Sequence, residues 1–314
     1  MKSINNRKAT RFIILFSLFS ITLISNCSGG PGYVPAGGNN NMCSQNLSPD
    51  VKKLLGCPTA PAASTQQLPP SIIIANGGTY GECPSVPTTG PISVYITATD
   101  FQTLGPVSGA AVSFFTSTSN TVGTSSPDIT ATAGQNGITT ATLPTGIPFV
   151  AKGSSTGYKD TYQFGDLLAG NDAGHFLPVL LISDFTVGLL SSFASVKPDW
   201  TNGAVAGEVV DCSGNAIQNA IVSLVDAKTG ITVTTSLVYF TYSSTFKADI
   251  PDSSLTSTSD NGIFLSINTP PGDYYLVAQG VLPGGNAIVV LGESYVESVA
   301  NSVSIANILP PVTK

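Results

Sequence analysis

The chain of 314 residues is rich in Gly (32) and Pro (22), and only 10% of its residues are charged. Beyond residue 26, eight lysines face 18 Asp and Glu and no arginine remains, so we expect no binding to nucleic acid, which requires clustered Arg and Lys. The length suggests about two domains, and the recurrent Ser, Thr, Val and Ile favour strands over helices.

The first 26 residues have the layout of an export signal. Four basic residues precede 13 uncharged, mostly apolar residues at positions 12–24. This run is shorter than the roughly 20 residues that a membrane-spanning helix needs, and its length is typical of the apolar region of a secretory signal peptide. Residues 1–26 are therefore predicted to be a signal peptide.

Cys27 follows the apolar run and decides how the protein is held. Residues 23–27, LISNC, resemble the lipobox of bacterial lipoproteins, in which a peptidase cuts before a cysteine that carries lipid. Asn26 departs from the Gly, Ala or Ser usual at its position. The resemblance implies lipid on Cys27 and attachment to a bacterial membrane, at the outer membrane or cell surface. The alternatives are a secretory signal with Cys27 kept for a disulfide, and an uncleaved anchor.

Two short segments follow the signal. Residues 27–42 are dominated by Gly, Pro and Asn without an apolar period, which predicts a flexible tether. In the Cys-containing segment 43–90, Ser48 and Pro49 are typical of a helix start and Gly56 of a helix stop. The pattern predicts one short helix there.

The remaining cysteines are candidates for disulfides, because an exported protein meets oxidising conditions. Cys43, Cys57, Cys83 and Cys212 allow three pairings, and the sequence does not choose among them. We expect Cys43–Cys57, because this bridge would close the short helix. Free thiols are the alternative. The spacings and the single histidine predict no metal site.

Two copies of one strand pattern fill 91–184 and 203–314. Each copy opens with a strand that ends in an aspartate, Asp100 or Asp211, before a turn and a second strand. Each then has an Asn-Gly turn, a short strand and a Pro-containing turn, and each ends in an apolar strand. This spacing predicts an all-β fold with two tandem Ig-like sandwiches of about 100 residues each.

The second copy resembles the carboxypeptidase regulatory-like domain, a transthyretin-like sandwich of about seven strands. The resemblance rests on Gly207, Val209, Asp211, Gly214, Ile217, Ala220, Val222, Asp260, Gly262, Phe264, Pro271, Gly272 and Tyr274. The first copy is the weaker match and has Gln135 in place of Asp260. The resemblance implies a fold that accompanies catalytic domains and is not itself catalytic. We expect the glycines to serve turns or close strand contacts, the aspartates to bond turn backbone, and Tyr274 to fill the core.

Residues 185–202 connect the two copies. Leu189, Leu190, Phe193 and Val196 recur at helical spacing, which predicts a short helix that packs the domains together. Trp200 is expected to anchor this junction. An exposed tryptophan that stacks on a ligand is the alternative.

One formal catalytic motif occurs. Residues 153–157, GSSTG, fit the G-x-S-x-G pattern with Ser155 at its centre. A nucleophile elbow needs a strand before the serine, a helix after it, and histidine and acid partners. A Ser/Thr/Gly-rich loop surrounds Ser155 instead, and His175 is the single histidine. We therefore interpret the motif as a loop.

The sequence evidence for a metal site is equally weak. One histidine excludes the zinc site of the zinc carboxypeptidases, which takes two His and one Glu. Asp260 with Asn261, and Asn171 with Asp172, offer oxygen donors for calcium, but neither pair has the spacing of a dedicated calcium loop.

The sequence thus predicts a non-enzymatic, lipid-anchored envelope protein that acts as a structural or protein-binding module without a cofactor. Its expected partners are the membrane, through lipid on Cys27, and an unidentified protein or glycan. The alternative is a surface adhesin that binds carbohydrate or host matrix.

Overall fold

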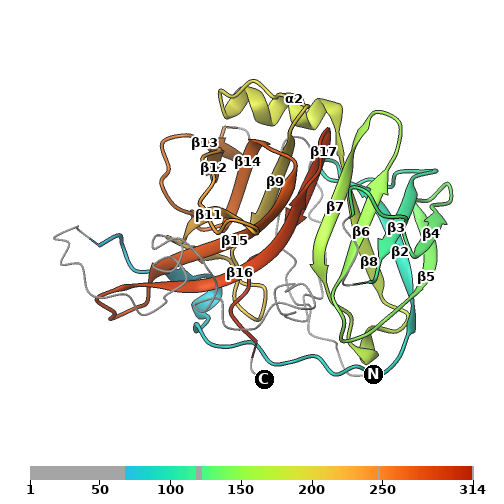
Figure 1. Cartoon of the computed structure of the whole chain (residues 1–314), viewed down its shortest axis with the longest axis horizontal. Helices are drawn as coiled ribbons and strands as arrows, with labels where there is room; N and C mark the ends of the chain where they lie inside the picture. Colours follow the sequence, from blue (N-terminus) through green and yellow to red (C-terminus); the bar gives the residue numbers. More distant parts are fainter. Residues whose placement is uncertain (1–67, 118–121, 246–247, 313–314) are drawn as a thin grey trace.

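The computed structural model describes residues 68–117, 122–245 and 248–312. It consists mainly of strands whose sheets pack as β-sandwiches, so the predicted all-β class is confirmed (Figure 1). The signal peptide, the tether, and Cys27, Cys43 and Cys57 lie outside the described residues. Within the described residues, no helix combines the length and apolar character needed to cross a membrane.

The first sandwich packs two sheets around an apolar core. One sheet has β2 between β5 (antiparallel) and β8 (parallel), and the other continues from β4 through β3 and β6 to β7. Side chains alternate along the strands, so Phe114 and Phe149 meet inside as an edge-to-face pair. The elements are β2 (Ile92–Asp100), β3 (Ala111–Phe115), β4 (Ile129–Thr132), β5 (Ile138–Leu143), β6 (Phe149–Ser154), β7 (Tyr158–Asp166), η3 (Gly170–Asp172) and β8 (Phe176–Ser183).

The second sandwich repeats this plan. Its first strand, β9, lies between β14 (antiparallel) and β17 (parallel), as β2 lies between β5 and β8. Its other sheet is β11, β15 and β16, and β12 and β13 extend the first sheet beyond β14. The elements are β9 (Gly203–Glu208), β10 (Ile217–Gln218), β11 (Ile221–Asp226), β12 (Ser236–Ser243), β13 (Ala248–Asp252), β14 (Ile263–Thr269), β15 (Gly272–Val281), β16 (Ile288–Ser298) and β17 (Ser302–Ala306).

The aspartates that end the first strands have the same role in both copies. Oδ1 of Asp100 accepts hydrogen bonds from the backbone N–H groups of Gln102 and Thr103, at 3.0 and 2.7 Å. Oδ1 of Asp211 accepts two from the turn that follows it, both at 2.8 Å. The prediction that these side chains bond turn backbone is confirmed. Tyr274 is buried in the core, as expected, and donates to the carbonyl of Pro270.

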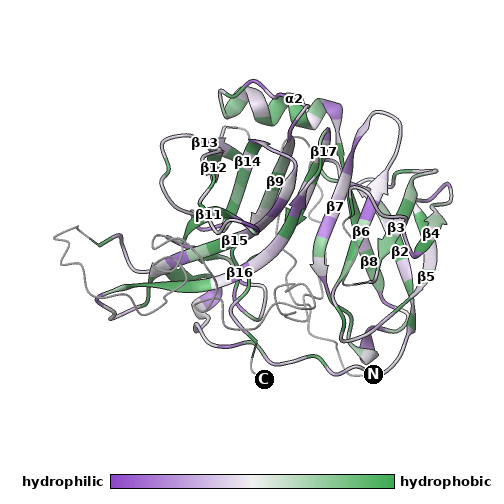
Figure 2. Cartoon of the chain, in the orientation of Figure 1, coloured by the Kyte–Doolittle hydropathy of each residue, from purple (hydrophilic) through white to green (hydrophobic). Residues whose placement is uncertain are grey.

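A parallel strand pair joins the two sandwiches into one sheet, which the repeat pattern did not predict. β7 pairs with β17, with Asp160 opposite Ser302 and Phe164 opposite Ala306. The sheet therefore runs without interruption from β13 to β4. On both sides of this joint, apolar residues lie on the strands of the two sandwiches (Figure 2).

β7 pairs with β8 only at its start and then diverges from it, and further along it pairs with β17. Only Tyr158 and Lys159 pair with β8. Further along, side chains of β7 replace the missing ladder, because Oε1 of Gln163 accepts from Leu180 N–H at 2.6 Å and Oγ1 of Thr161 accepts from Ile182 N–H at 3.3 Å. The backbone of β8 thus stays satisfied while the two strands separate.

The segment before the first sandwich packs on the second sandwich. β1 (Ile73–Ile74) pairs with β10 and leads into η2 (Ala75–Gly77), and Ile72 is buried in the second core. Cys83 forms a disulfide with Cys212, with Cα atoms 5.2 Å apart. The chain therefore passes the second sandwich before it forms the first.

The α-helix α2 (Asp184–Phe193) covers one end of the joint (Figure 1). Oγ of Ser183 caps its N-terminus by accepting from Thr186 N–H at 3.1 Å. Val187 and Leu190 face an apolar cluster that includes strands of the second sandwich, and Trp200 packs against the same cluster. The helix predicted within 185–202 is present and begins one residue earlier.

Candidate functional site

A partly enclosed cavity of about 240 Å³ lies between the sandwiches, beside α2. The face of the joined sheet forms one wall, through side chains such as Ala206, Leu265 and Val303. Leu180 and Ile182 of β8 form the opposite side, and Leu190 of α2 and Trp200 also line it. The cavity exists because β7 diverges from β8, so that the two layers enclose a wedge of space.

The far end of the cavity is polar. β7, β17 and β9 run parallel, and Ile305 is level with Gln163 on one side and Ala206 on the other. Two residues further along, this register places Asn307 level with Glu208. Glu208 N–H donates to Oδ1 of Asn307 at 3.1 Å. Asp166, the last residue of β7, lies near the same end of these strands.

The carboxyl group of Asp166 lies in an unusual environment. Its Oδ2 is buried and has no hydrogen-bond partner among the described residues. Burial raises the pKa of this carboxyl from its ordinary 3.8 to about 7, because the charged form loses hydration without a compensating partner. A hydrogen-bond donor placed beside this buried, unpaired oxygen would stabilise the carboxylate.

A second buried acid, Asp172, stands near the start of β8. Its Oδ2 accepts from Ala169 N–H at 2.7 Å, and its Oδ1 lies 3.6 Å from Nδ1 of His175. With Glu208 and Asp166, three carboxyl groups line this end, and no Lys or Arg is among the lining residues. The cavity is therefore apolar beside α2 and acidic at the other end.

Two exposed aromatic rings, on β2 and at the start of β8, lie side by side. Phe176 lines the cavity and is 58% exposed, and Tyr95 beside it is 44% exposed. The rings stack with centroids 5.1 Å apart and an interplanar angle of 26°. Exposed, stacked rings of this kind are suited to contact with an apolar or planar ligand face.

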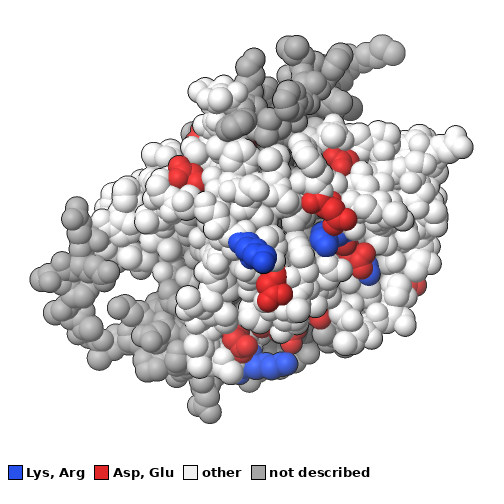
Figure 3. Space-filling model, turned by 90° about the horizontal axis from the view of Figure 1, so that it is seen from above, with Lys and Arg blue, Asp and Glu red and all other residues white. Residues whose placement is uncertain are grey.

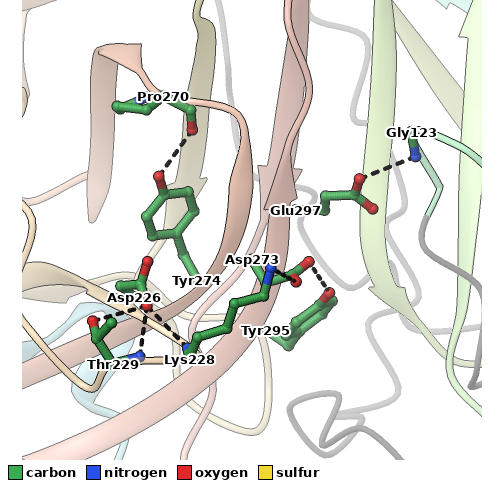
Figure 4. A network of polar contacts seen from close by, with 9 residues as sticks. All are labelled: Gly123, Asp226, Lys228, Thr229, Pro270, Asp273, Tyr274, Tyr295 and Glu297. Atoms are coloured by element: carbon green, nitrogen blue, oxygen red, sulfur yellow. Dashed lines mark hydrogen bonds and ion pairs between the residues drawn. The ribbon is translucent and has the colours of Figure 1, made fainter.

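The opposite face of the joint holds a polar network (Figure 4). Oε1 of Glu297 on β16 accepts from Gly123 N–H of the first sandwich at 3.1 Å. Tyr295 donates to Oδ1 of Asp273 at 2.8 Å, and Nζ of Lys228 lies 3.8 Å from Oδ2 of the same residue. The Glu297–Gly123 bond ties the sandwiches together and the contacts of Asp273 lie within the second sandwich, so we assign the network a structural role.

Charge on the surface around α2 is sparse and mixed in sign. Figure 3, a view onto this face, shows basic side chains beside acidic ones and a largely uncharged surface. Ion pairs between opposite charges occur between Lys152 and Asp160 and between Lys159 and Asp184. This face therefore offers no basic patch for a polyanion.

Ser155 is not placed for catalysis with His175. It lies in the turn that joins β6 to β7, so a strand and not a helix follows it. Tyr158 pairs with Ser183, whereas His175 directly precedes β8 at its other end. The eight residues of β8, at about 3.3 Å each, therefore separate His175 from the turn that holds Ser155 by roughly 26 Å. The G-x-S-x-G match is a β-hairpin turn.

Two of the four candidate oxygen donors for calcium, Asn261 and Asp172, are engaged within the protein. Oδ1 of Asn261 accepts from Ile263 N–H at 3.1 Å, and its amide donates to Asp249 at 2.9 Å. Oδ2 of Asp172 bonds backbone, as described above. Within the described ranges, no group of three or more His, Cys, Asp or Glu side chains is placed to hold a metal ion.

Sequence reasoning singled out Cys83 and Cys212 only as members of a set, and the structure brings them together. It missed Asp166 entirely. The sequence did contain a signal, because an acid directly before the apolar pair Leu167–Leu168 is unusual at the end of a buried strand. This signal could be interpreted only once β7 was known to pair with β17.

No model of a known protein family matches the chain, and no curated protein matches it. Solved structures match it weakly. The Bacillus anthracis TIE protein is 16% identical, with 71% of this chain and 34% of that chain covered and a TM-score of 0.22. The shaft pilin SpaA from Lactobacillus rhamnosus GG is 11% identical (71% and 98% covered, TM-score 0.23). A streptococcal ancillary pilin is 15% identical (71% and 63% covered, TM-score 0.23).

This chain thus spans about a third of the TIE protein's length, 34%. At these TM-scores the likenesses assign no function. The resemblance to the carboxypeptidase regulatory-like domain stays a prediction.

Proposed function

We propose that the protein is a lipid-anchored component of a bacterial cell envelope that acts as a structural or protein-binding module and not as an enzyme. The anchor is lipid on Cys27, followed by the tether of residues 27–42. The two sandwiches then form the part that stands away from the membrane and meets its partner.

One observation carries this proposal: the described segment that precedes the first sandwich is bonded to the second sandwich. Cys83 is linked to Cys212 across 129 residues, and the β7–β17 pair makes the two sandwiches one sheet. A tether attached at this end therefore holds both sandwiches as a single rigid unit. Rigidity of this kind suits a spacer or a presented binding surface.

The anchor is tested by metabolic labelling with a palmitate analogue in a bacterial host. We expect label on the wild type and on a Cys57→Ala control, and no label on Cys27→Ala. The unlabelled variant should also move from the membrane fraction to the soluble fraction. Label that persists on Cys27→Ala would refute the anchoring.

A carbohydrate-binding adhesin is the second candidate, and the stacked pair Tyr95–Phe176 is the observation that favours it. Sugar rings pack on exposed aromatic faces. A glycan array probed with wild type and with Tyr95→Ala/Phe176→Ala should show saturable binding that only the wild type retains. Equal signals from both proteins, or no saturable signal, would leave the structural module as the function.

A further inference from the structure

We propose that the cavity between the sandwiches is a binding site for a small apolar primary amine, with the ammonium group at Asp166 and the alkyl part along the aliphatic walls that lead toward α2. This site does not depend on how the chain is anchored. Three observations carry it: the shape of the cavity, the acceptor at its end, and the sign of its charge.

The apolar part of the cavity is suited to an alkyl chain. Its walls are aliphatic side chains from β8, α2 and the joined sheet, among them Ile182, Leu190, Leu265 and Val303. The volume of about 240 Å³ lies slightly below the ~300–1,000 Å³ typical of pockets for drug-sized ligands, so the occupant is a smaller molecule. Transfer of a methylene group from water to such walls is favourable.

The acceptor at the far end of the cavity, Oδ2 of Asp166, lacks a hydrogen-bond donor. Oδ2 of Asp166 is buried without a hydrogen-bond partner among the described residues, whereas a buried polar atom in a folded protein almost always has one. An ammonium group supplies three donors and a positive charge. It would satisfy this oxygen and offset the cost of burying the carboxylate.

The surrounding charge excludes the other common amphiphiles. Asp172 and Glu208 line the same end as Asp166, and no Lys or Arg lines the cavity. A fatty acid, phosphate or sulfate would bring a second negative charge beside these carboxyl groups. His175, beside Asp172, is the one further titratable group of the lining.

Trp200 makes the test direct, because it is the single tryptophan of the chain and lines the cavity. Its fluorescence is followed as the purified full chain is titrated at pH 8 with octylamine, octan-1-ol and octanoate. An alkylamine is protonated at this pH, as lysine is. We expect saturable binding of octylamine, about tenfold weaker binding of octan-1-ol, and no binding of octanoate.

Variants assign the effect to the site. Asp166→Asn should remove the preference for octylamine over octan-1-ol and leave octan-1-ol binding unchanged. Glu82→Gln, a surface acid outside the cavity, should behave as wild type. Ala206→Leu, which fills the cavity, should abolish binding of both probes, and circular dichroism confirms that each variant is folded.

Three results would overturn the proposal: octanoate that binds as tightly as octylamine, no saturable change with any probe, or Asp166→Asn with the preference intact. If Asp166→Asn does not fold, the ranking of the three probes on wild type and its loss in Ala206→Leu decide the question.

Discussion

Nζ of Lys159 lies 2.9 Å from Oδ1 of Asn301, and this contact joins the start of β7 to the turn that precedes β17. The same ammonium group is 3.4 Å from Oδ1 of Asp184 and 4.4 Å from the ring centroid of Trp200. Its side chain is only 16% exposed. One lysine therefore contacts the first sandwich, the second sandwich, α2 and the linker.

Replacing this lysine should loosen the junction. Lys159→Met keeps the apolar stem but removes a charged hydrogen bond and a cation–π contact, so we expect a loss of about 1–2 kcal/mol of unfolding free energy in urea. Lys228→Met is the matched control. Its side chain is 80% exposed and its Nζ lies 3.8 Å from Oδ2 of Asp273, and we expect a loss of less than about 0.5 kcal/mol there. Equal losses for both variants would contradict this account of the junction.

The disulfide should matter more. Cys83–Cys212 closes a loop of 129 residues, and chain entropy predicts that bridges over loops of this size stabilise by several kcal/mol. We expect Cys83→Ala/Cys212→Ala to lower the unfolding free energy by about 2–5 kcal/mol. Peptide mapping without reductant checks the pairing, since Cys83 found linked to Cys43 or Cys57 would be incompatible with it.

The repeat in the sequence predicted the strands well, because alternation and turn residues act locally. Asp100 and Asp211 are examples, since their bonds reach only a few residues along the chain. The pairing of β7 with β17 was not predictable in this way. Phe164 and Ala306 meet across more than a hundred residues, and nothing in either strand names its partner. The cavity and the perturbed Asp166 follow from that pairing, so they were missed together.

Stability should depend on pH through Asp166. Between about pH 4 and pH 7 the folded state retains a proton on this carboxyl that the unfolded chain has released, because the pKa rises from 3.8 to about 7 on folding. The unfolding free energy therefore falls as the pH rises through this window and levels off above it. The full change corresponds to at most about 4 kcal/mol.

Asp166→Asn should remove this loss. Relative to wild type, the variant is expected to gain stability from pH 4.5 to about pH 7 in urea unfolding, and the difference should then level off toward pH 8. Burial also raises the pKa of Glu293 and Glu297, but both carboxyl groups are present in the two proteins, so their contribution cancels in the difference. A difference that does not change with pH would show that the Asp166 carboxyl does not titrate in this range.

Two glycines should respond oppositely to alanine. A Cβ on Gly207 would clash with the backbone carbonyl of Ala306 on the neighbouring strand, so β9 and β17 would have to move apart. We expect Gly207→Ala to cost more than about 3 kcal/mol, comparable to severe overpacking of a core. Gly188, within α2, has open space where its Cβ would lie, and alanine there should add about 0.5–1 kcal/mol because it favours the helix. Thermal unfolding of the two variants beside wild type measures whether each substitution lowers or raises the stability. If Gly207→Ala were as stable as wild type, the close approach of β9 and β17 would not be required for the fold.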